Sequence, residues 1–273
     1  MKQYRQVLAI EGRFEASING LAAGPRDQLF AAGDASVKVF DDGGKPLREW
    51  TAAKPPLSVA VAGDGSVWAG EAGQVEIFDG EGRRADAWQD VERLGRVTAI
   101  GFVEDAVLVA DASDRCLRRY SRHGEFLNNI GKNNRMKGFL IPNGSLDFSV
   151  DSEGIIHAAN PGKHRVERYT AEGELLGHIG RFGGQDPAGF SGCCNPTNVA
   201  VIGRDFIYVT EKAGPRAKVY DFDGKLLGII ASKAFDARCK NMDITVDSRG
   251  RVWVADTARL SILAFEPEGG GTA

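Results

Sequence analysis

Short alternations of apolar and polar residues fill the chain, and no stretch carries a long apolar period of the helical kind. Two runs that alternate with a period of two flank Asp247–Gly250 in the segment MDITVDSRGRVWVAD. The segment KVYDFDGKLLGII repeats this arrangement around a turn that contains Asp and Gly. Period-two alternation is typical of strands, and such a turn between two strands is typical of a β-hairpin. The pattern therefore predicts an all-β protein.

The hairpins belong to a unit that recurs six times. Each unit contains a short apolar run that ends in an acid or Asn, at Asp34, Glu71, Asp111, Asn160, Glu211 and Asp256. An aromatic residue follows six to nine positions later, and four positions after it stands a glycine: Gly44, Gly82, Gly124, Gly173, Gly224 and Gly269. Units of 38 to 51 residues that hold four short strands match the blades of a β-propeller.

The two ends of the chain predict how the ring closes. After Phe265 the last unit has only EPEGGGTA, which cannot make a fourth strand, whereas the N-terminal YRQVLAI alternates like one. We therefore expect a single six-bladed propeller over residues 1–268 whose last blade takes its outer strand from residues 1–14. The expected blades are 17–55, 56–96, 97–143, 144–196, 197–241, and 242–268 plus 1–14, followed by a flexible tail at 269–273.

The repeated motif resembles that of the NHL-repeat propellers. It consists of an inner strand, Asp-x-x-Gly, an aliphatic run ending in Asp, and a strand ending in aromatic-x-x-x-Gly. The clearest copies are DITVDSRGRVWVADTARLSILAFEPEG and NPTNVAVIGRDFIYVTEKAGPRAKVYDFDG, and the first two units are degenerate. The resemblance covers nearly the whole chain and implies the fold. It does not select a function, because such propellers include enzymes, sensors and interaction platforms.

Composition and charge argue against several classes of protein function. The net charge of −3 and a pI near 5.9 argue against a nucleic-acid or anionic-membrane binder. No apolar run is long enough to span a bilayer or to form a signal peptide. We therefore expect a soluble, cytoplasmic monomer, exported only if a leader was removed. The 35 glycines among 273 residues fall in hairpin turns and long loops, which argues against a phosphate-binding loop.

The four strands of a blade are lettered a to d from the channel outward. Propeller geometry places the loops between strands b and c, and the loops between blades, on one face of the ring. The long loops of this chain fall on that face. The segment GFSGCCNPTN carries Cys193 and Cys194, and Cys239 holds nearly the same place one blade later. With His164 they are candidate ligands of a soft metal ion. Two alternatives stay open: buried thiols that fill space, and a strained, reducible Cys193–Cys194 disulfide.

A basic patch on the same face is a candidate site for a small anion or a protein partner. Lys212 and Arg216 lie in or beside its loop TEKAGPR, and an Arg can hold a carboxylate or phosphate with two hydrogen bonds. The other members of this candidate ligand site are Lys163, Arg165, Lys240 and Asn198. The alternative is that these charges are solvated or paired locally.

Oxygen ligands and catalytic groups form the last candidates. Polar residues begin the inner strands, and among them Asp147, Asn198 and Asp243 suit a divalent cation such as Ca²⁺. His164 is the histidine best placed to act as a base, with Glu211 or Asp256 and a central metal, in a hydrolase or lyase. The recurring acids have a simpler explanation in hydrogen bonds to turn amides.

The sequence thus favours a ligand- or protein-binding propeller that acts through its loop-rich face. A metal-dependent hydrolase or lyase, or a cysteine-based metal or redox protein using the same face, is the alternative.

Overall fold

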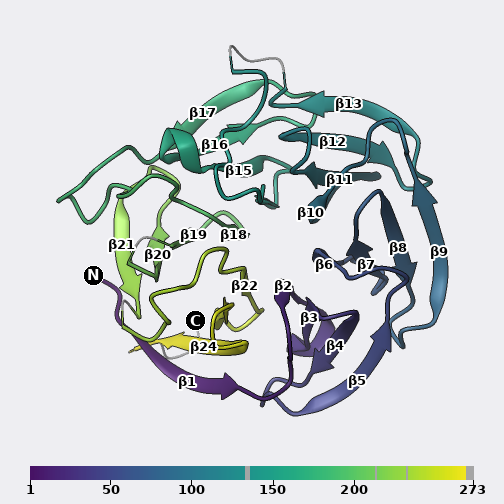
Figure 1. Ribbon diagram of the computed structural model, residues 1–273. Helices are drawn as coiled ribbons and strands as arrows, with labels where there is room; N and C mark the ends of the chain where they lie inside the picture. Colours follow the sequence, from purple (N-terminus) through teal and green to yellow (C-terminus); the bar gives the residue numbers. More distant parts are fainter. Residues whose placement is uncertain (133–135, 213, 232, 269–273) are drawn as a thin grey trace.

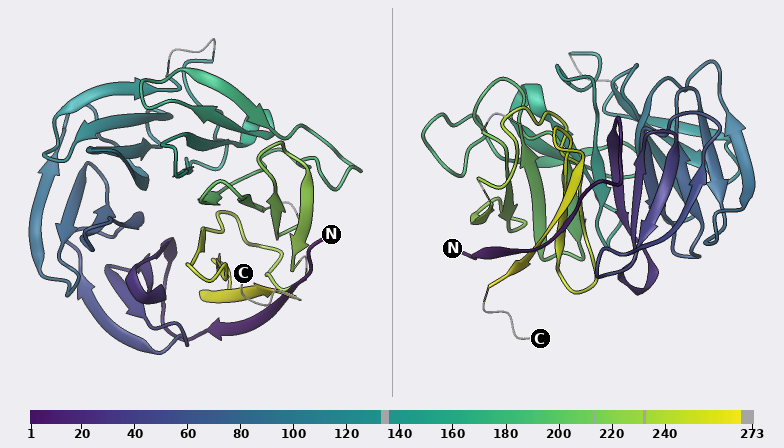
Figure 2. Two further views of the ribbon diagram at one scale, coloured as in Figure 1. Left: turned by 180° about the vertical axis from the view of Figure 1, so that it is seen from behind. Right: turned by 60° about the horizontal axis from the view of Figure 1, so that its bottom comes forward.

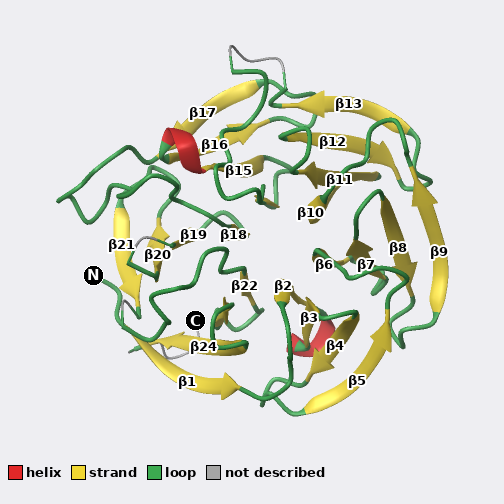
Figure 3. Ribbon diagram, viewed as in Figure 1, coloured by secondary structure: helices red, strands yellow, loops and turns green. Residues whose placement is uncertain are grey.

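The computed structural model describes residues 1–132, 136–212, 214–231 and 233–268. Six antiparallel sheets of four strands each stand around a central channel (Figure 1). Strands and loops make up nearly all of the described chain, and the two helical segments are short 3₁₀ turns at Pro25–Asp27 and Pro161–Lys163 (Figure 3). The predicted all-β, six-bladed propeller is confirmed. Gly269 and the expected tail at 269–273 lie outside the described residues.

The strands of each blade follow the chain from the channel outward. Blade 1 contains β2 (Ile18–Ala23), β3 (Leu29–Gly33), β4 (Ser36–Phe40) and β5 (Pro46–Thr51). Blade 2 contains β6 (Ser58–Val61), β7 (Val67–Gly70), β8 (Gln74–Phe78) and β9 (Arg84–Gln89). Blade 3 contains β10 (Val97–Val103), β11 (Ala106–Asp111), β12 (Cys116–Ser121) and β13 (Phe126–Ile130). Blade 4 contains β14 (Phe148–Val150), β15 (Ile156–Asn160), β16 (Arg165–Tyr169) and β17 (Leu175–Ile179). Blade 5 contains β18 (Val199–Ile202), β19 (Phe206–Glu211), β20 (Arg216–Tyr220) and β21 (Leu226–Ile230).

Blade 6 closes the ring with both ends of the chain. It contains β22 (Ile244–Val246), β23 (Val252–Asp256), β24 (Ser261–Pro267) and, as its outer strand, β1 (Tyr4–Ile10), which pairs antiparallel with β24. Residues ahead of β1 continue onto blade 5, where the Lys2 amide donates to the Leu227 carbonyl at 2.6 Å. The N-terminal strand predicted to close the last blade is therefore confirmed.

Side-chain burial explains why the blades stack. The second strands β3, β11, β15 and β23 are buried along their whole length, whereas the outer strands β5 and β9 are mostly exposed. The second strands are apolar on both faces because each face packs against a neighbouring blade. The core is accordingly divided into clusters that join adjacent blades.

The Asp-x-x-Gly turns fix the outer hairpins. In blade 5 the Asp221 carboxylate accepts the amides of Asp223 and Lys225, at 3.1 and 2.8 Å. The Gly224 amide donates to the Asp221 carbonyl, and Gly224 has φ +83°. That conformation favours glycine, which explains the fixed offset of glycine from the aromatic. The loops at the opposite ends of the strands are longer, and they project from one side of the ring (Figure 2). Among the described residues, no helix is long and apolar enough to cross a membrane.

Candidate functional site

Six polar side chains at the starts of the inner strands join each blade to the next around the channel. In blades 1 to 3 these side chains donate to a carbonyl of the following blade: Asn19 to Pro56 at 2.8 Å, Ser58 to Val97 at 3.0 Å and Thr98 to Leu146 at 2.7 Å. Each bond satisfies a backbone oxygen of the following blade. The polar residues that begin the inner strands therefore have a structural role in these three blades.

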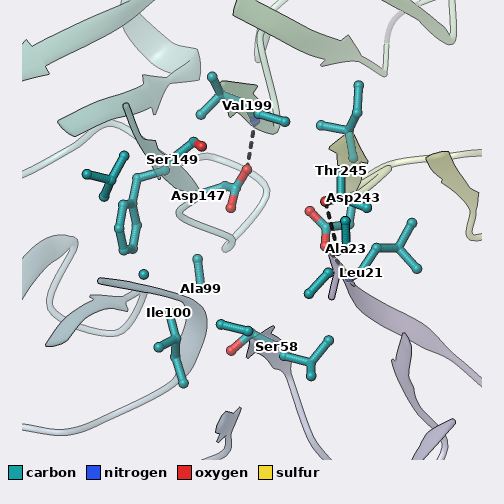
Figure 4. Close-up of a pocket in the computed structure, with 18 of the residues that line it drawn as sticks. Leu21, Ala23, Ser58, Ala99, Ile100, Asp147, Ser149, Val199, Asp243 and Thr245 are labelled. Carbon is teal, nitrogen blue, oxygen red and sulfur yellow. Dashed lines mark hydrogen bonds between the residues drawn. The ribbon is translucent and has the colours of Figure 1, made fainter. Parts of the chain in front are cut away.

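Blades 4 to 6 complete the circle with carboxylates and an amide. The Asp147 carboxylate accepts the Val199 amide at 2.7 Å, and the Asp243 carboxylate accepts the Leu21 amide at 2.5 Å (Figure 4). The Asn198 side chain donates to Asp243 at 3.1 Å. The side-chain oxygen of Asn198 is buried and has no hydrogen-bond partner among the described residues. The structure thus brings three of the expected oxygen ligands together.

Burial dominates the electrostatics of the two channel carboxyls. It raises the pKa of Asp147 well above its usual value, with a further contribution from the negative charge of Asp243. Burial also raises the pKa of Asp243, to about 6. Two carboxyls that share a dry site resist ionising together. A cation placed between them would reverse this effect, because it stabilises both charged forms.

The channel below these acids is a cavity of about 360 Å³ lined by the inner strands of all six blades. Figure 4 shows Asp147 and Asp243 on its wall among small and apolar side chains such as Ala23, Ala99 and Ile100. The strands run from the acids toward the short-turn face, so the acids stand at the end of the cavity nearer the loops. Hydroxyl groups of Ser58, Ser149 and Thr245 also line the cavity, and its acidic groups lie at the end nearer the loops.

A second pocket, of about 220 Å³, forms the channel mouth on the loop-rich face. Two cations, Arg96 and Lys240, line it, and none of its lining residues is acidic. The polar residues beside them are Ser17, Asn19, Thr98, Ser145, Asn241 and Thr257. Both cations are exposed, and neither forms an ion pair with any residue that the structure describes. The Arg96 guanidinium donates to the Gly144 carbonyl at 3.3 Å. The mouth therefore presents uncompensated positive charge among hydroxyl and amide groups.

Three of the other expected cations, Lys163, Arg165 and Arg216, form ion pairs with buried carboxylates. Glu211 is fully buried and pairs with Arg216 and, at 3.1 Å, with the fully buried Lys218. Glu167 is also fully buried and pairs with Arg165 and, at 3.3 Å, with Lys163.

Lys212 is positioned through its backbone, since its amide donates to the Asn195 side chain at 2.8 Å. Of the candidate ligand residues, Lys240 is the one that the structure places in the mouth.

The cysteines lie in different surroundings. Cys193 is exposed and Cys194 is buried, and their sulfur atoms are 2.7 Å apart. The Cys239 thiol donates to the Asp256 carboxylate at 3.0 Å. All four cysteines are free thiols, and no group of three His, Cys, Asp or Glu side chains in the described part of the chain is arranged to hold a metal ion.

The three candidate catalytic residues also have separate partners. The His164 ring packs edge-on against Phe182, with 4.9 Å between ring centroids. Asp256 accepts the amides of Asp236 and Arg259, both at 2.9 Å, as expected of an acid that caps a turn. Neither these two residues nor Glu211 lines the mouth or the channel cavity.

Sequence reasoning did not identify Arg96, although a signal was present. A polar residue at the start of each inner strand is evident in the sequence, and a strand directs every second side chain to the same face. Counting back two positions from Asn19, Thr98, Asp147 and Asp243 gives four residues of the mouth: Ser17, Arg96, Ser145 and Asn241.

Blade 2 differs from the others in its pair of acids. Glu71 and Glu76 are both buried, and the Gln74 side chain donates to Glu71 at 2.5 Å. Burial and the neighbouring Glu76 raise the pKa of Glu71 to about 7. Blades 3 and 5 place a cation, Arg118 or Lys218, at the position of Glu76. Where those blades hold an ion pair, blade 2 therefore places two carboxyls side by side, which favours the protonated form of Glu71.

Comparisons with known proteins support the fold. No protein-family profile matches the chain. A virginiamycin B lyase from Staphylococcus aureus is similar in structure, with a TM-score of 0.65 and 10% identity over 97% of this chain and 99% of that one. The WD40 repeats of RRP9 give a TM-score of 0.68 at 13% identity, covering 98% of this chain and 100% of that one. A protein of unknown function from Bacteroides thetaiotaomicron gives 0.73 at 16% identity, covering 98% and 77%. At these identities the likeness establishes a β-propeller and no activity.

Proposed function

We propose that this chain is a propeller of the NHL-repeat type that binds a small anion, or the acidic group of a protein partner, at the channel mouth. The observation that carries the proposal is the unpaired state of Arg96 and Lys240 in a pocket without acidic lining. A carboxylate or phosphate group would supply the missing counter-charge. The hydroxyl and amide groups beside the cations would orient it.

The size and position of the pocket suit this chemistry. A volume of about 220 Å³ accommodates a small organic acid or a phosphate ester rather than an extended chain. Arg offers a planar fork of donors and Lys a compact positive charge, so together they suit an anion with several oxygen atoms. Both cations are exposed and lie at the rim, so binding should weaken as salt concentration rises.

Calorimetric titration with citrate and with inorganic phosphate, at low ionic strength, tests this proposal. Arg96→Ala combined with Lys240→Ala is expected to weaken binding by about 10- to 100-fold, as loss of two charge-assisted contacts implies. Lys45→Ala is the matched control, because Lys45 is an exposed cation at a short turn on the opposite face. Equal affinity in the wild type and the double variant would refute an anion site at the mouth.

A second candidate function is divalent-cation binding in the channel, as a metal-dependent hydrolase or lyase would require. The unpartnered oxygen of Asn198 beside Asp147 and Asp243 favours it, since Ca²⁺ takes carboxylate and amide oxygens. Some propellers of similar structure are lyases. Calcium titration of the wild type and of Asp243→Asn would decide: heat that disappears in the variant supports the site, and no heat in the wild type removes it.

A further inference from the structure

The adjacent cysteines of blade 5 form a site that the proposed anion pocket does not use. Cys193 and Cys194 lie in the loop ahead of β18, and a turn at Gly192, with φ +75°, precedes them. Side chains of consecutive residues in an extended strand point apart. Here the loop instead brings the two sulfur atoms within 2.7 Å of each other.

The loop that carries the pair is held firmly on both sides. Asn195 is fully buried; its amide group donates to the Ser191 carbonyl at 2.7 Å, and its oxygen accepts the Lys212 amide at 2.8 Å. These bonds span the two cysteines and attach their loop to the strand end that carries Lys212. The proximity of the thiols is therefore built into the fold of the loop.

The two thiols differ in exposure and in acidity. Cys193 is exposed, whereas Cys194 is 2% exposed. A hydrogen bond from Cys194 and the positive charge of Lys212 lower the pKa of Cys193. Burial and the hydrogen bond with Cys193 raise the pKa of Cys194. Exposure and acidity together favour Cys193 as the thiol that reacts with a solute, because the thiolate is the reacting form.

The remaining cysteines lack this combination. Cys116 and Cys239 are buried, and burial raises the pKa of each to about 11. Two thiols alone also fall short of the three or four ligands of a soft-metal site, and no third His, Cys, Asp or Glu joins them among the described residues. The surroundings thus favour redox chemistry over metal binding.

We propose that Cys193 and Cys194 are a reversible oxidation site for hydroperoxides, in which the exposed thiol attacks and the buried thiol resolves. The Cys193 thiolate attacks the terminal peroxide oxygen, the O–O bond breaks, and the alcohol or water product takes up a proton. Cys193 becomes a sulfenic acid. The Cys194 sulfur then attacks the Cys193 sulfur, the S–O bond breaks, and the departing hydroxide leaves as water with the Cys194 proton. Two thiols are oxidised to one disulfide and one peroxide is reduced.

The product would be easily reduced. Consecutive Cα atoms are about 3.8 Å apart across a trans peptide, which is shorter than the usual spacing across a disulfide. A strained disulfide with one exposed sulfur exchanges readily with thiols, so the site would return to the dithiol when the peroxide is gone. This behaviour suits a sensor on the loop-rich face rather than a structural crosslink.

Intact and peptide mass spectrometry after treatment with stoichiometric hydrogen peroxide tests the proposal. The wild type is expected to lose two hydrogen atoms within the peptide that holds both cysteines and to regain them with a phosphine reductant. Cys194→Ser should stop at the sulfenic acid, which dimedone traps on Cys193. Cys193→Ser, a change at an exposed position, should remain reduced over the same period.

Two matched variants complete the design. Cys116→Ser and Cys239→Ser should oxidise as the wild type does, because their thiols take no part. The proposal is overturned if the wild type stays reduced, if Cys193 is oxidised to the sulfonic acid without a disulfide, or if Cys193→Ser reacts as fast as the wild type. Binding of citrate or phosphate is measured separately, so failure here leaves the anion site unaffected.

Discussion

Two groups of cations on the loop-rich face have opposite surroundings. Lys218 and Arg216 in blade 5 share the fully buried carboxylate of Glu211, whereas Arg96 and Lys240 at the channel mouth have no acidic partner among the described residues. The first group neutralises a charge that the fold has already buried. In the second group the positive charges stay available to an anionic ligand or a protein partner. The presence of a buried acid on the neighbouring strand, and not the number of cations, decides which group can bind a ligand.

Removing the buried acid should give the largest change. Glu211→Ala leaves Lys218 charged and fully buried, so the free energy of unfolding should fall by about 3–5 kcal/mol. Denaturant unfolding measures this loss. Replacing both residues with apolar ones, Glu211→Leu with Lys218→Met, should recover much of it; no recovery would mean that the pair does not act through its charges.

The acid pair of blade 2 should show a pH dependence that the ion pair of blade 5 lacks. The pKa of Glu71 is raised from its usual 4.5 to about 7, so the folded protein holds a proton that the unfolded chain releases. Its stabilising contribution is complete below pH 4.5 and is lost as the pH rises toward 7.

Glu71→Gln, which carries no titrating proton, should flatten this slope and add roughly 2 kcal/mol at pH 8 relative to the wild type. Unfolding curves between pH 4 and 8 give the comparison, with Glu11→Gln as the exposed control. Parallel slopes in the wild type and Glu71→Gln would contradict a protonated Glu71.

Losing a side-chain hydrogen bond between blades should lower the free energy of unfolding less than losing a partner of a buried ion pair. Ser58→Ala removes one hydrogen bond to Val97 in the channel wall and should lower the free energy of unfolding by about 1 kcal/mol. Ser152→Ala, at an exposed turn, provides the control in the same measurement. A change as large as that of Glu211→Ala would show that the ring depends on these bonds more than on its buried ion pairs.

The smallest effect on stability is expected at the mouth. Lys240→Ala should change the free energy of unfolding by no more than about 0.5 kcal/mol, because Lys240 is exposed and pairs with no described acid. The same unfolding assay measures it. A loss of several kcal/mol would place Lys240 with the structural cations of blade 5.

The blades could be predicted from the sequence because their signals are local. The Asp221 and Gly224 turn and the alternation around it lie within one hairpin, and the closing strand follows from the missing fourth strand after Phe265. The site depends on contacts between distant segments. The bond from the Leu21 amide to Asp243 joins residues at opposite ends of the chain, and the mouth gathers Arg96 and Lys240 from blades far apart in sequence.

Local neighbours could have indicated part of the charge pairing. Strand register places Lys218 opposite Val209, two residues before Glu211, so the two side chains lie on the same face of their hairpin. The spacing along the inner strands indicates the position of Arg96. It does not show that Arg96 and Lys240 lack an acidic partner, because that is visible only once the blades are assembled.

The location of a bound anion tests the central claim most directly. Crystals soaked in sodium selenate, examined at the selenium absorption edge, should show an anomalous peak between the Arg96 guanidinium and the Lys240 ammonium. The same crystals of the Arg96→Ala and Lys240→Ala double variant should show none there. A peak at Arg165 or Arg216 instead, or a wild-type mouth without one, would contradict the account.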